Sequence, residues 1–349
     1  MDGLSHTPTA ASKAGAAPPE PHTRGAPTER ETGKAVAGPS PFKPQTIDIS
    51  ALRVDGSRRA RRSATTVEIE SACTGAGLFV AAGHGIDAAL STAFDAAQAF
   101  FGLPPGIKDR VPRINRYGYV PDRIEARDPS STAYMGRSSL AAEYLDMGLA
   151  GEVDLGAVES LGCDGFAAAV RAYQAAALAT AHGVLEALAV TLGVPGFFAD
   201  RMSEPQCRLR FLHYPPCDRL ADGSAPVFST PHTDYGAITL LAVDGLPGLE
   251  VLHDGAWTPV AAPGGSMIVQ LGDMLARWTN DRYRSTPHRV VGASGADRFS
   301  IPFFVNPDPS TVVSTIDSCV TAERPERYEP VTAGEFLISR IDSPTEPYV

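Results

Sequence analysis

Short runs of strand-forming residues dominate the second half of the chain, and they limit its possible folds more than any other feature. Turn signals such as Asp244-Gly245, Pro247-Gly248 and Asp254-Gly255 separate these runs at close intervals. Short strands with frequent turns are typical of an all-β sandwich or barrel. Strands are predicted at 237–243, 248–253, 266–271, 286–292, 298–305 and 310–315.

The first half of the chain has helical patterns instead. Apolar residues recur at helical spacing in three long segments, and glycine or proline follows each of them. Helices are predicted at 61–74, 87–101 and 166–192, with a last helix at 332–342. Residues 112–148 lack such a pattern, so they are predicted to form a loop. The expected fold is mainly β with flanking helices and a helical or mixed N-terminal region.

These patterns divide the chain into four parts. The predicted parts are a tail at 1–43, an α-rich region at 44–195, a β core at 196–320, and a C-terminal helix with its tail at 321–349. The first part is rich in Ala, Pro, Gly, Thr and Ser and has almost no large apolar side chains. Such a segment cannot bury enough surface to offset its ordering entropy, so we expect it to be disordered.

Composition argues against several classes of partner. The net charge of −10 over 349 residues is unfavourable for a nucleic-acid surface, which needs clustered lysine and arginine. No apolar run approaches the ~20 residues of a membrane helix, and no signal-peptide pattern begins the chain. Five cysteines without a metal-binding or disulfide spacing are typical of a reducing compartment. We therefore expect a cytoplasmic protein that binds neither nucleic acid nor membranes.

A histidine and a carboxylate stand two positions apart just before one predicted strand. In an extended chain the side chains of His232 and Asp234 point to the same face, so both can reach one ion. A second histidine, His288, follows in a later predicted strand. Two histidines and one carboxylate form the facial triad of non-haem iron(II) oxygenases, which leaves coordination positions open for substrate and oxygen.

An arginine and a serine share one face of the strand that follows. Arg298 lies ten residues beyond His288, and Ser300 follows two residues later. A guanidinium fork beside a hydroxyl suits the carboxylate of a small molecule. The plain alternative is a solvated arginine on an ordinary strand, but several motifs agree in order and spacing here.

In these motifs the chain resembles the iron(II)/2-oxoglutarate-dependent oxygenase superfamily, and within it the isopenicillin N synthase-like branch. The resemblance covers about residues 45–340. It rests on Gly83–Ile86, Leu212–Pro216, His232–Asp234, Gly272–Leu275, Asn280–Val290 and Arg298–Phe304. It implies a double-stranded β-helix, or jelly roll, with flanking helices, and it favours a monomer.

The resemblance also implies roles for individual residues. The implied iron(II) ligands are His232, Asp234 and His288. Arg298 and Ser300 are implied to bind the far carboxylate of 2-oxoglutarate. Many relatives carry Asn-Tyr-Tyr-Pro-Pro where this chain has Leu212-His213-Tyr214-Pro215-Pro216, so only Tyr214 carries over, as a hydrogen-bond donor to 2-oxoglutarate.

Further candidates concern the substrate. Arg210 shares one strand face with Tyr214, where it would either meet a substrate acid or form a structural salt bridge; both readings stay open. The other candidate substrate contacts are Arg116, Tyr119, Phe304 and Tyr348, the last as a lid residue. Leu240 and Ile301, together with Phe304, are expected to keep water out of the site.

The implied reaction consumes O2 and 2-oxoglutarate, releases succinate and carbon dioxide, and hydroxylates a C–H bond of a polar small molecule. Desaturation, ring expansion, cyclisation and epoxidation are alternatives within this group. Oxidases of the isopenicillin N synthase type use no 2-oxoglutarate, yet share the Arg-x-Ser motif. A non-catalytic jelly-roll binding protein and a zinc hydrolase are more distant alternatives. The Ala-, Gly- and Arg-rich usage suggests a high-GC bacterium and a role in antibiotic or other secondary-metabolite biosynthesis.

Overall fold

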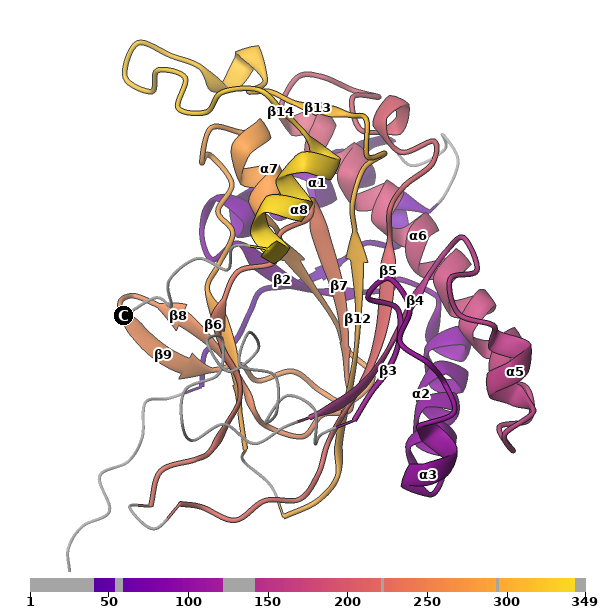
Figure 1. Ribbon diagram of the computed structural model, residues 1–349. Helices are drawn as coiled ribbons and strands as arrows, with labels where there is room; N and C mark the ends of the chain where they lie inside the picture. The colour runs from indigo at the N-terminus through magenta and orange to yellow at the C-terminus, as the bar shows by residue number, and fades with distance from the viewer. Residues whose placement is uncertain (1–40, 54–58, 122–141, 221–222, 293–294, 343–349) are drawn as a thin grey trace, which may run out of the picture. The chain divides into compact units, whose positions relative to one another are not determined.

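The computed structural model describes residues 41–53, 59–121, 142–220, 223–292 and 295–342 (Figure 1). These residues belong to one compact unit, Pro39–Val349. Nearly all of the predicted N-terminal tail, and Tyr348, lie outside the described residues. Among the described helices, none combines the length and apolar character needed to cross a bilayer.

The helices lie where the apolar spacing predicts them. The four long helices are α1 (Arg59–Thr74), α2 (Asp87–Phe101), α6 (Phe166–Thr191) and α8 (Ala333–Asp342). The shorter helices are α3 (Pro105–Lys108), α5 (Leu155–Glu159) and α7 (Asp273–Trp278), and the 3-10 turns are η1 (Ser50–Leu52), η2 (Ala199–Arg201) and η3 (Asp317–Cys319). Pro104 and Pro105 separate α2 from α3. Pro105 occupies the first turn of α3, where its missing N–H costs nothing.

An eight-stranded main sheet runs in the order β1-β2-β10-β7-β12-β5-β4-β3. Its strands are β1 (Thr46–Asp48), β2 (Leu78–Ala82), β3 (Gly118–Val120), β4 (Glu143–Gly148), β5 (Arg208–Tyr214), β7 (Ile238–Val243), β10 (Met267–Leu271) and β12 (Arg298–Val305). Only the β1–β2 pair among these is parallel. Strands from both sides of the predicted boundary at 195/196 therefore share one sheet.

A smaller sheet of four strands has the order β6-β11-β8-β9. Its strands are β6 (Val227–His232), β8 (Leu249–His253), β9 (Ala256–Pro259) and β11 (His288–Val291), and a separate pair joins β13 (Val312–Val313) to β14 (Val331–Thr332). The architecture is mainly β with helices beside the main sheet, as the sequence predicts.

The prediction of a loop at 112–148 is wrong for its described ends. Residues of β3 and β4 pair with each other, and β4 also pairs along its length with β5. The sequence pattern does not predict β4, because acidic residues such as Glu143 and Asp146 are uncommon in a buried strand. Both carboxylates are satisfied in the fold, the first by Lys108 and the second by Arg210.

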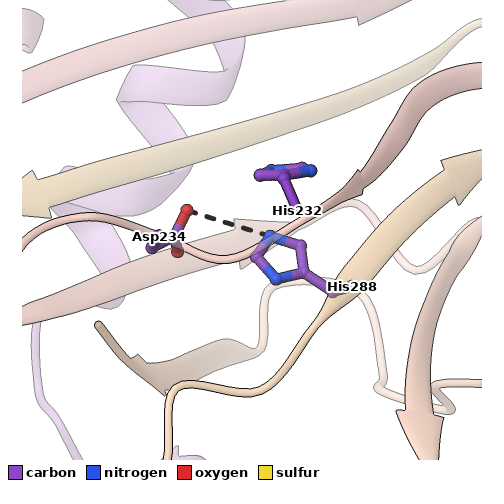
Figure 2. Close-up of side chains that lie close together, drawn as sticks. All are labelled: His232, Asp234 and His288. Carbon is purple, nitrogen blue, oxygen red and sulfur yellow. Dashed lines mark ion pairs between the residues drawn. The ribbon is translucent and has the colours of Figure 1, made fainter. Parts of the chain in front are cut away.

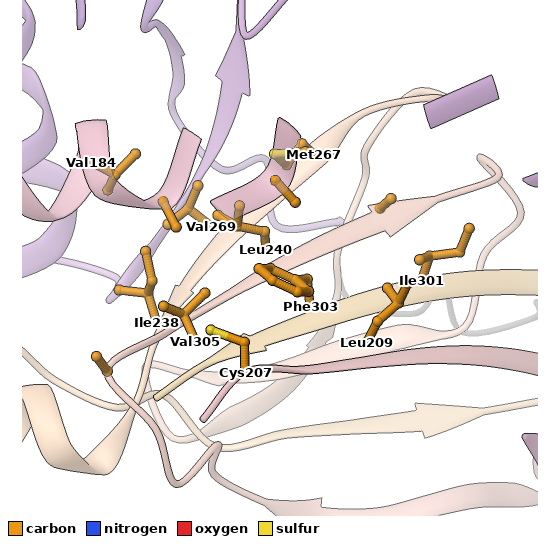
Figure 3. Close-up of a cluster of buried hydrophobic side chains, with 14 of the residues drawn as sticks. Val184, Cys207, Leu209, Ile238, Leu240, Met267, Val269, Ile301, Phe303 and Val305 are labelled. Atoms are coloured by element: carbon orange, nitrogen blue, oxygen red, sulfur yellow. The ribbon is translucent and has the colours of Figure 1, made fainter. Parts of the chain in front are cut away.

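The two faces of the main sheet have different surroundings (Figure 1). We call the face turned to α2 and α6 the outer face and the face turned to the smaller sheet the inner face. On the outer face, Leu209, Phe303 and their neighbours pack with Val184 of α6 (Figure 3). On the inner face, Tyr214 packs with Phe228 of β6 and Val290 of β11.

This division corrects one expectation about the site. Leu240 and Ile301 belong to the core of the outer face, so they do not line the inner face (Figure 3). Side chains alternate along a strand, and the neighbouring Leu241 belongs instead to the apolar cluster shared with the smaller sheet. Of the three residues expected to keep water out of the site, only Phe304 lies on the same face of β12 as Arg298 and Ser300.

Candidate metal and cosubstrate site

His232, Asp234 and His288 converge at the end of the smaller sheet (Figure 2). His232 is the last residue of β6 and pairs directly with His288, the first residue of β11. One possible ligand atom from each of the three side chains lies within 4.8 Å of the others, and His288 Nε2 is 3.8 Å from Asp234 Oδ1. The strand ends at His232, so Asp234 reaches the cluster from the following loop, not by alternation along a strand.

Both histidines are oriented by main-chain carbonyl groups two residues earlier. Nδ1 of His232 lies 2.7 Å from the oxygen of Thr230, and Nδ1 of His288 lies 3.2 Å from the oxygen of Thr286. A carbonyl oxygen only accepts, so each Nδ1 carries the proton and each Nε2 keeps its lone pair. Burial, reinforced by the neighbouring imidazole of His288, lowers the pKa of His232 to about 4. A neutral imidazole at pH 7 is the form that binds a metal.

The donor set fits iron(II). Imidazole nitrogen suits iron, and one carboxylate with two histidines leaves open positions on the metal. Asp234 and His288 are buried, whereas His232 is half-buried, so the cluster sits at the edge of the interior. No other group of three or more His, Cys, Asp or Glu side chains with this closeness occurs in the part of the chain that the structure describes.

The loop that carries Asp234 is tied to the C-terminal helix. The main-chain N–H of Asp273 donates to the carbonyl oxygen of Asp234 at 2.8 Å. The side chain of Asp273 in turn accepts from Thr233 Oγ1 at 3.2 Å and from Arg340 Nη2 at 2.7 Å. The guanidinium of Arg340 also lies 5.1 Å from the ring centre of Tyr235. Helix α8 therefore contacts Tyr235 directly and is linked to Thr233 through Asp273, on the two sides of a candidate ligand.

Arg298, Ser300 and Tyr214 form what we call the carboxylate cradle. Arg298 begins β12 and pairs in register with Tyr214 at the end of β5. The hydroxyl groups of Tyr214 and Ser300 lie 3.5 Å apart, and the guanidinium of Arg298 lies 4.7 Å from the tyrosine ring centre. Each of the three residues is at most 4% exposed.

The arginine of the cradle lacks partners that burial demands. Nε and Nη1 of Arg298 are buried, and no atom of the described residues accepts a hydrogen bond from them. Leaving a charged donor buried and unsatisfied costs several kcal/mol, on the order of what an ion pair must offset. A carboxylate bound at the end of the guanidinium would accept from Nη1, so the cradle fits the far end of 2-oxoglutarate.

Arg210 forms a salt bridge and also faces the site. Its Nε and Nη2 donate to the two oxygens of Asp146 at 2.6 and 2.7 Å, and its guanidinium lies 4.1 Å from the ring centre of Tyr144. The structural reading of Arg210 is thus borne out. Arg210 has the parity of Tyr214 on β5, which packs on the inner face, and its charge lowers the pKa of His232 after the larger effects of burial and His288. Phe304 lies 5.9 Å from the same guanidinium.

The structure places Tyr119 away from the site, and the roles of Arg116 and Tyr348 stay predictions. Tyr119 belongs to the core of the outer face and donates to Glu143 Oε2 at 2.5 Å, because β3 turns its odd-numbered side chain away from the inner face. Arg116 has a positive φ of 72° in the tight turn that Ile114 and Tyr117 close. The fifth candidate, Tyr348, lies outside the described residues.

Sequence reasoning missed a set of polar residues on the outer face. We call Lys108, Tyr119, Glu143, His213 and Asp297 the outer-face network. Lys108 Nζ lies 2.6 Å from Glu143 Oε2, while His213 lies 2.7 Å from Glu143 Oε1 and 2.6 Å from Asp297 Oδ1. These residues are distant from one another in the chain, so no local sequence motif predicts that they come together.

A hollow of about 710 Å³ elsewhere in the molecule contains none of the candidate site residues. It lies by the end of α1 and the loop after η3, and its lining includes four arginines and two acidic residues. Two of these arginines are already paired, Arg282 with Glu70 and Arg327 with Asp281. We therefore place the chemistry at the buried cluster and cradle, where titratable groups converge.

Known proteins resemble the chain along most of its length. Residues 203–307 match the family described as the 2OG-Fe(II) oxygenase superfamily, and residues 45–151 match the family described as non-haem dioxygenase in morphine synthesis N-terminal. The 2-oxoglutarate-Fe(II) type oxidoreductase hxnY of Emericella nidulans is 30% identical over 330 residues, which cover 85% of this chain and 89% of that protein. The 2-oxoglutarate-dependent dioxygenase citB of Monascus ruber is 33% identical, with 76% and 85% covered.

Solved structures show the same likeness. A putative 2OG-Fe(II) oxygenase family protein from Caulobacter crescentus has a TM-score of 0.71 and 30% identity, and the match covers 85% of this chain and 98% of that one. Neurospora crassa T7H in complex with alpha-KG has a TM-score of 0.72 and 25% identity, with 85% and 96% covered. These neighbours are oxygenases with a jelly-roll core, which confirms the predicted fold class.

Proposed function

Because the chain belongs to the iron(II)/2-oxoglutarate-dependent oxygenases, we propose that it hydroxylates a C–H bond of a polar small molecule and releases succinate and carbon dioxide. The protein is a non-haem dioxygenase whose cofactor is iron(II) and whose cosubstrates are 2-oxoglutarate and O2. We propose hydroxylation as the reaction, a polar small molecule as the substrate, and a role for each residue of the site.

His232, Asp234 and His288 hold the iron in this proposal. The observation that carries the assignment is the convergence of one oxygen and two nitrogen ligand atoms within 4.8 Å, with both Nδ1 atoms engaged by carbonyl oxygens. When bound, iron and 2-oxoglutarate supply the oxidising chemistry, and the protein binds, orients and shields the reactants.

The carboxylate cradle binds the far carboxylate of 2-oxoglutarate. Arg298 supplies buried guanidinium donors that lack acceptors among the described residues, and the hydroxyls of Ser300 and Tyr214 lie beside it. An oxidase of the isopenicillin N synthase type would use the same cradle for its own substrate. The curated relatives reported above are named for their use of 2-oxoglutarate, which favours the dioxygenase.

The substrate contacts are assigned to Arg210 and Phe304 on the inner face. Arg208 Nη1 lies 3.7 Å from Asp146, which Arg210 already binds, so two guanidinium groups share one buried carboxylate. The excess positive charge suits a substrate with an acidic or electron-rich group. We assign the pathway to bacterial secondary metabolism, antibiotic biosynthesis included, on composition alone; the curated relatives reported above come from fungi, and one structural neighbour comes from a bacterium.

The test is anaerobic addition of iron(II) and then 2-oxoglutarate, followed by visible absorption spectroscopy. A weak charge-transfer band that needs both components is expected for the wild type, and Arg298→Ala should need far more 2-oxoglutarate to develop it. A screen for succinate release over polar metabolites then identifies the substrate. If iron binds and no band develops, the oxidase becomes the better assignment.

A further inference from the structure

The imidazole of His213 is held between two carboxylates on the outer face. Its Nδ1 lies 2.7 Å from Glu143 Oε1 and its Nε2 lies 2.6 Å from Asp297 Oδ1. The rings of Phe101 and Phe299 lie 5.5 and 4.9 Å from its centre, and the second is nearly parallel to it. An ionised carboxylate only accepts hydrogen bonds, so both ring nitrogens must donate. His213 is therefore an imidazolium in this arrangement.

The charges around His213 balance only in that state. Glu143 on β4 also accepts from Lys108 on α3 at 2.6 Å and from Tyr119 on β3 at 2.5 Å. Among the described residues these are the ionisable groups that face the imidazole, together with Asp297 ahead of β12. Two cations then meet two carboxylates. A neutral His213 would leave one carboxylate without its donor, because a neutral imidazole has a single N–H.

The network lies directly behind the carboxylate cradle. His213 precedes Tyr214 on β5, and Asp297 precedes Arg298 on β12. In the antiparallel pair, Tyr214 is opposite Arg298 and His213 is opposite Phe299. The His213–Asp297 contact therefore crosses the two strands at the point where the cradle residues leave them, and Glu143 anchors that contact to β4.

We propose that the His213 imidazolium is a positioning residue for 2-oxoglutarate, which fixes the strand ends that carry Tyr214 and Arg298. Cosubstrate affinity falls when His213 loses its proton, because the tie between β5 and β12 then opens. This inference rests on the proposed function of the cradle. It adds a pH-sensitive support on the face of the sheet opposite to the bound cosubstrate.

The direction of the pH effect follows from the surroundings of His213. Burial alone would lower its pKa, but the hydrogen bonds that His213 donates to Glu143 and Asp297 outweigh burial and raise the pKa of His213 above 6.5. Burial alone would raise the pKa of Glu143, but the hydrogen bonds that it accepts from His213, Lys108 and Tyr119 bring that pKa below the usual value. A raised histidine pKa means that the support is complete below pH 6.5 and is lost as the pH rises through the raised value.

The experiment measures the proton and the affinity separately. In protein labelled with ¹⁵N-histidine and loaded with zinc(II), the His213 signals, assigned by their loss in His213→Gln, report its pKa. Anaerobic titration of the iron(II)-loaded protein with 2-oxoglutarate, read from the charge-transfer band, gives Kd at each pH. We expect Kd to rise by about tenfold as His213 deprotonates, the lower end of what an outer supporting group contributes. A Kd that is flat across the titration of His213 overturns the proposal.

The matched variant is Asp297→Asn, since Asp297 is more than half exposed and its replacement keeps a hydrogen-bonding group of the same shape. It should lower the pKa of His213, and the midpoint of the Kd change should move down with it. His213→Gln should bind 2-oxoglutarate about tenfold more weakly at every pH in this range, with iron affinity unchanged. If Arg298→Ala leaves 2-oxoglutarate binding intact, the cradle assignment fails; if only the His213 variants have no effect, this inference alone fails.

Discussion

The two faces of β5 and β12 carry buried polar groups of opposite kinds. On the inner face, Nε and Nη1 of Arg298 have no acceptor among the described residues. On the outer face, Lys108, Tyr119 and His213 all reach Glu143. A network whose groups satisfy one another holds strands and helices together, whereas a buried charged donor without an acceptor, beside two hydroxyls, is available to a ligand. The same two strands thus separate support from binding by the alternation of their side chains.

Asp234→Ala should have the largest effect, because it removes one of the three candidate iron ligands. We expect iron binding and turnover to fall by more than the ~100-fold that loss of a mere supporting group costs. Iron content after desalting and succinate release measure the two losses. The matched control on the outer face is Asp297→Asn, which should bind iron like the wild type. Full activity of Asp234→Ala would remove the metal assignment.

Arg298→Met should change binding and stability in opposite directions. It removes the charged fork, so 2-oxoglutarate binding should weaken by about 1.5–3 kcal/mol, roughly ten- to a hundredfold. Without cosubstrate, unfolding in urea should require about 1–3 kcal/mol more, because an unsatisfied buried charge is gone. Arg298→Lys keeps the charge without the fork and should fall between. A destabilised Arg298→Met protein would mean that the arginine has a structural partner after all.

Lys108→Met tests the outer-face network, and it should lower the free energy of unfolding, whereas Arg298→Met should raise it. Glu143 would lose one donor but keep His213 and Tyr119, so we expect a loss of about 2 kcal/mol in unfolding free energy. Iron and 2-oxoglutarate affinities should change less than about twofold, since His213 keeps its contacts with Glu143 and Asp297 behind the cradle. Urea unfolding and the charge-transfer titration measure the two quantities. A large loss of cosubstrate binding would show that the support of the cradle depends on Lys108 as well as on His213.

The same contrast explains which features the sequence predicts. The ligand triad is foreseen because His232, Asp234 and His288 are the residue types that the chemistry itself needs. The four long helices are foreseen because apolar spacing reports burial directly. Arg298 is foreseen because its motif stands at a recognisable distance after His288.

Other features depend on contacts that no local pattern reports. Tyr119 was misassigned because the facing of a short strand depends on its register with β4, which tertiary pairing decides. β4 was missed because its acidic residues are neutralised by Lys108 and Arg210, far away in the chain. β6 was missed because Pro231 is uncommon within a strand and no apolar run surrounds it, although the strand carries His232 at its end.

Arg340→Gln should have the smallest effect, and it tests a third kind of contact. The guanidinium of Arg340 on α8 donates to Asp273, which holds the loop of Asp234 through its main-chain N–H and through Thr233. This chain of contacts supports the iron site from outside, so iron affinity should fall by about tenfold or less.

Cosubstrate affinity at saturating iron should stay unchanged in Arg340→Gln, because the cradle belongs to other strands. Arg340→Lys is the matched control, since it retains the charge beside Asp273 and should recover part of the loss. Competition with a metal chelator measures the iron affinity of both variants. If both variants bind iron like the wild type, the loop is held by the main-chain bond of Asp273 alone, and helix α8 contributes only packing.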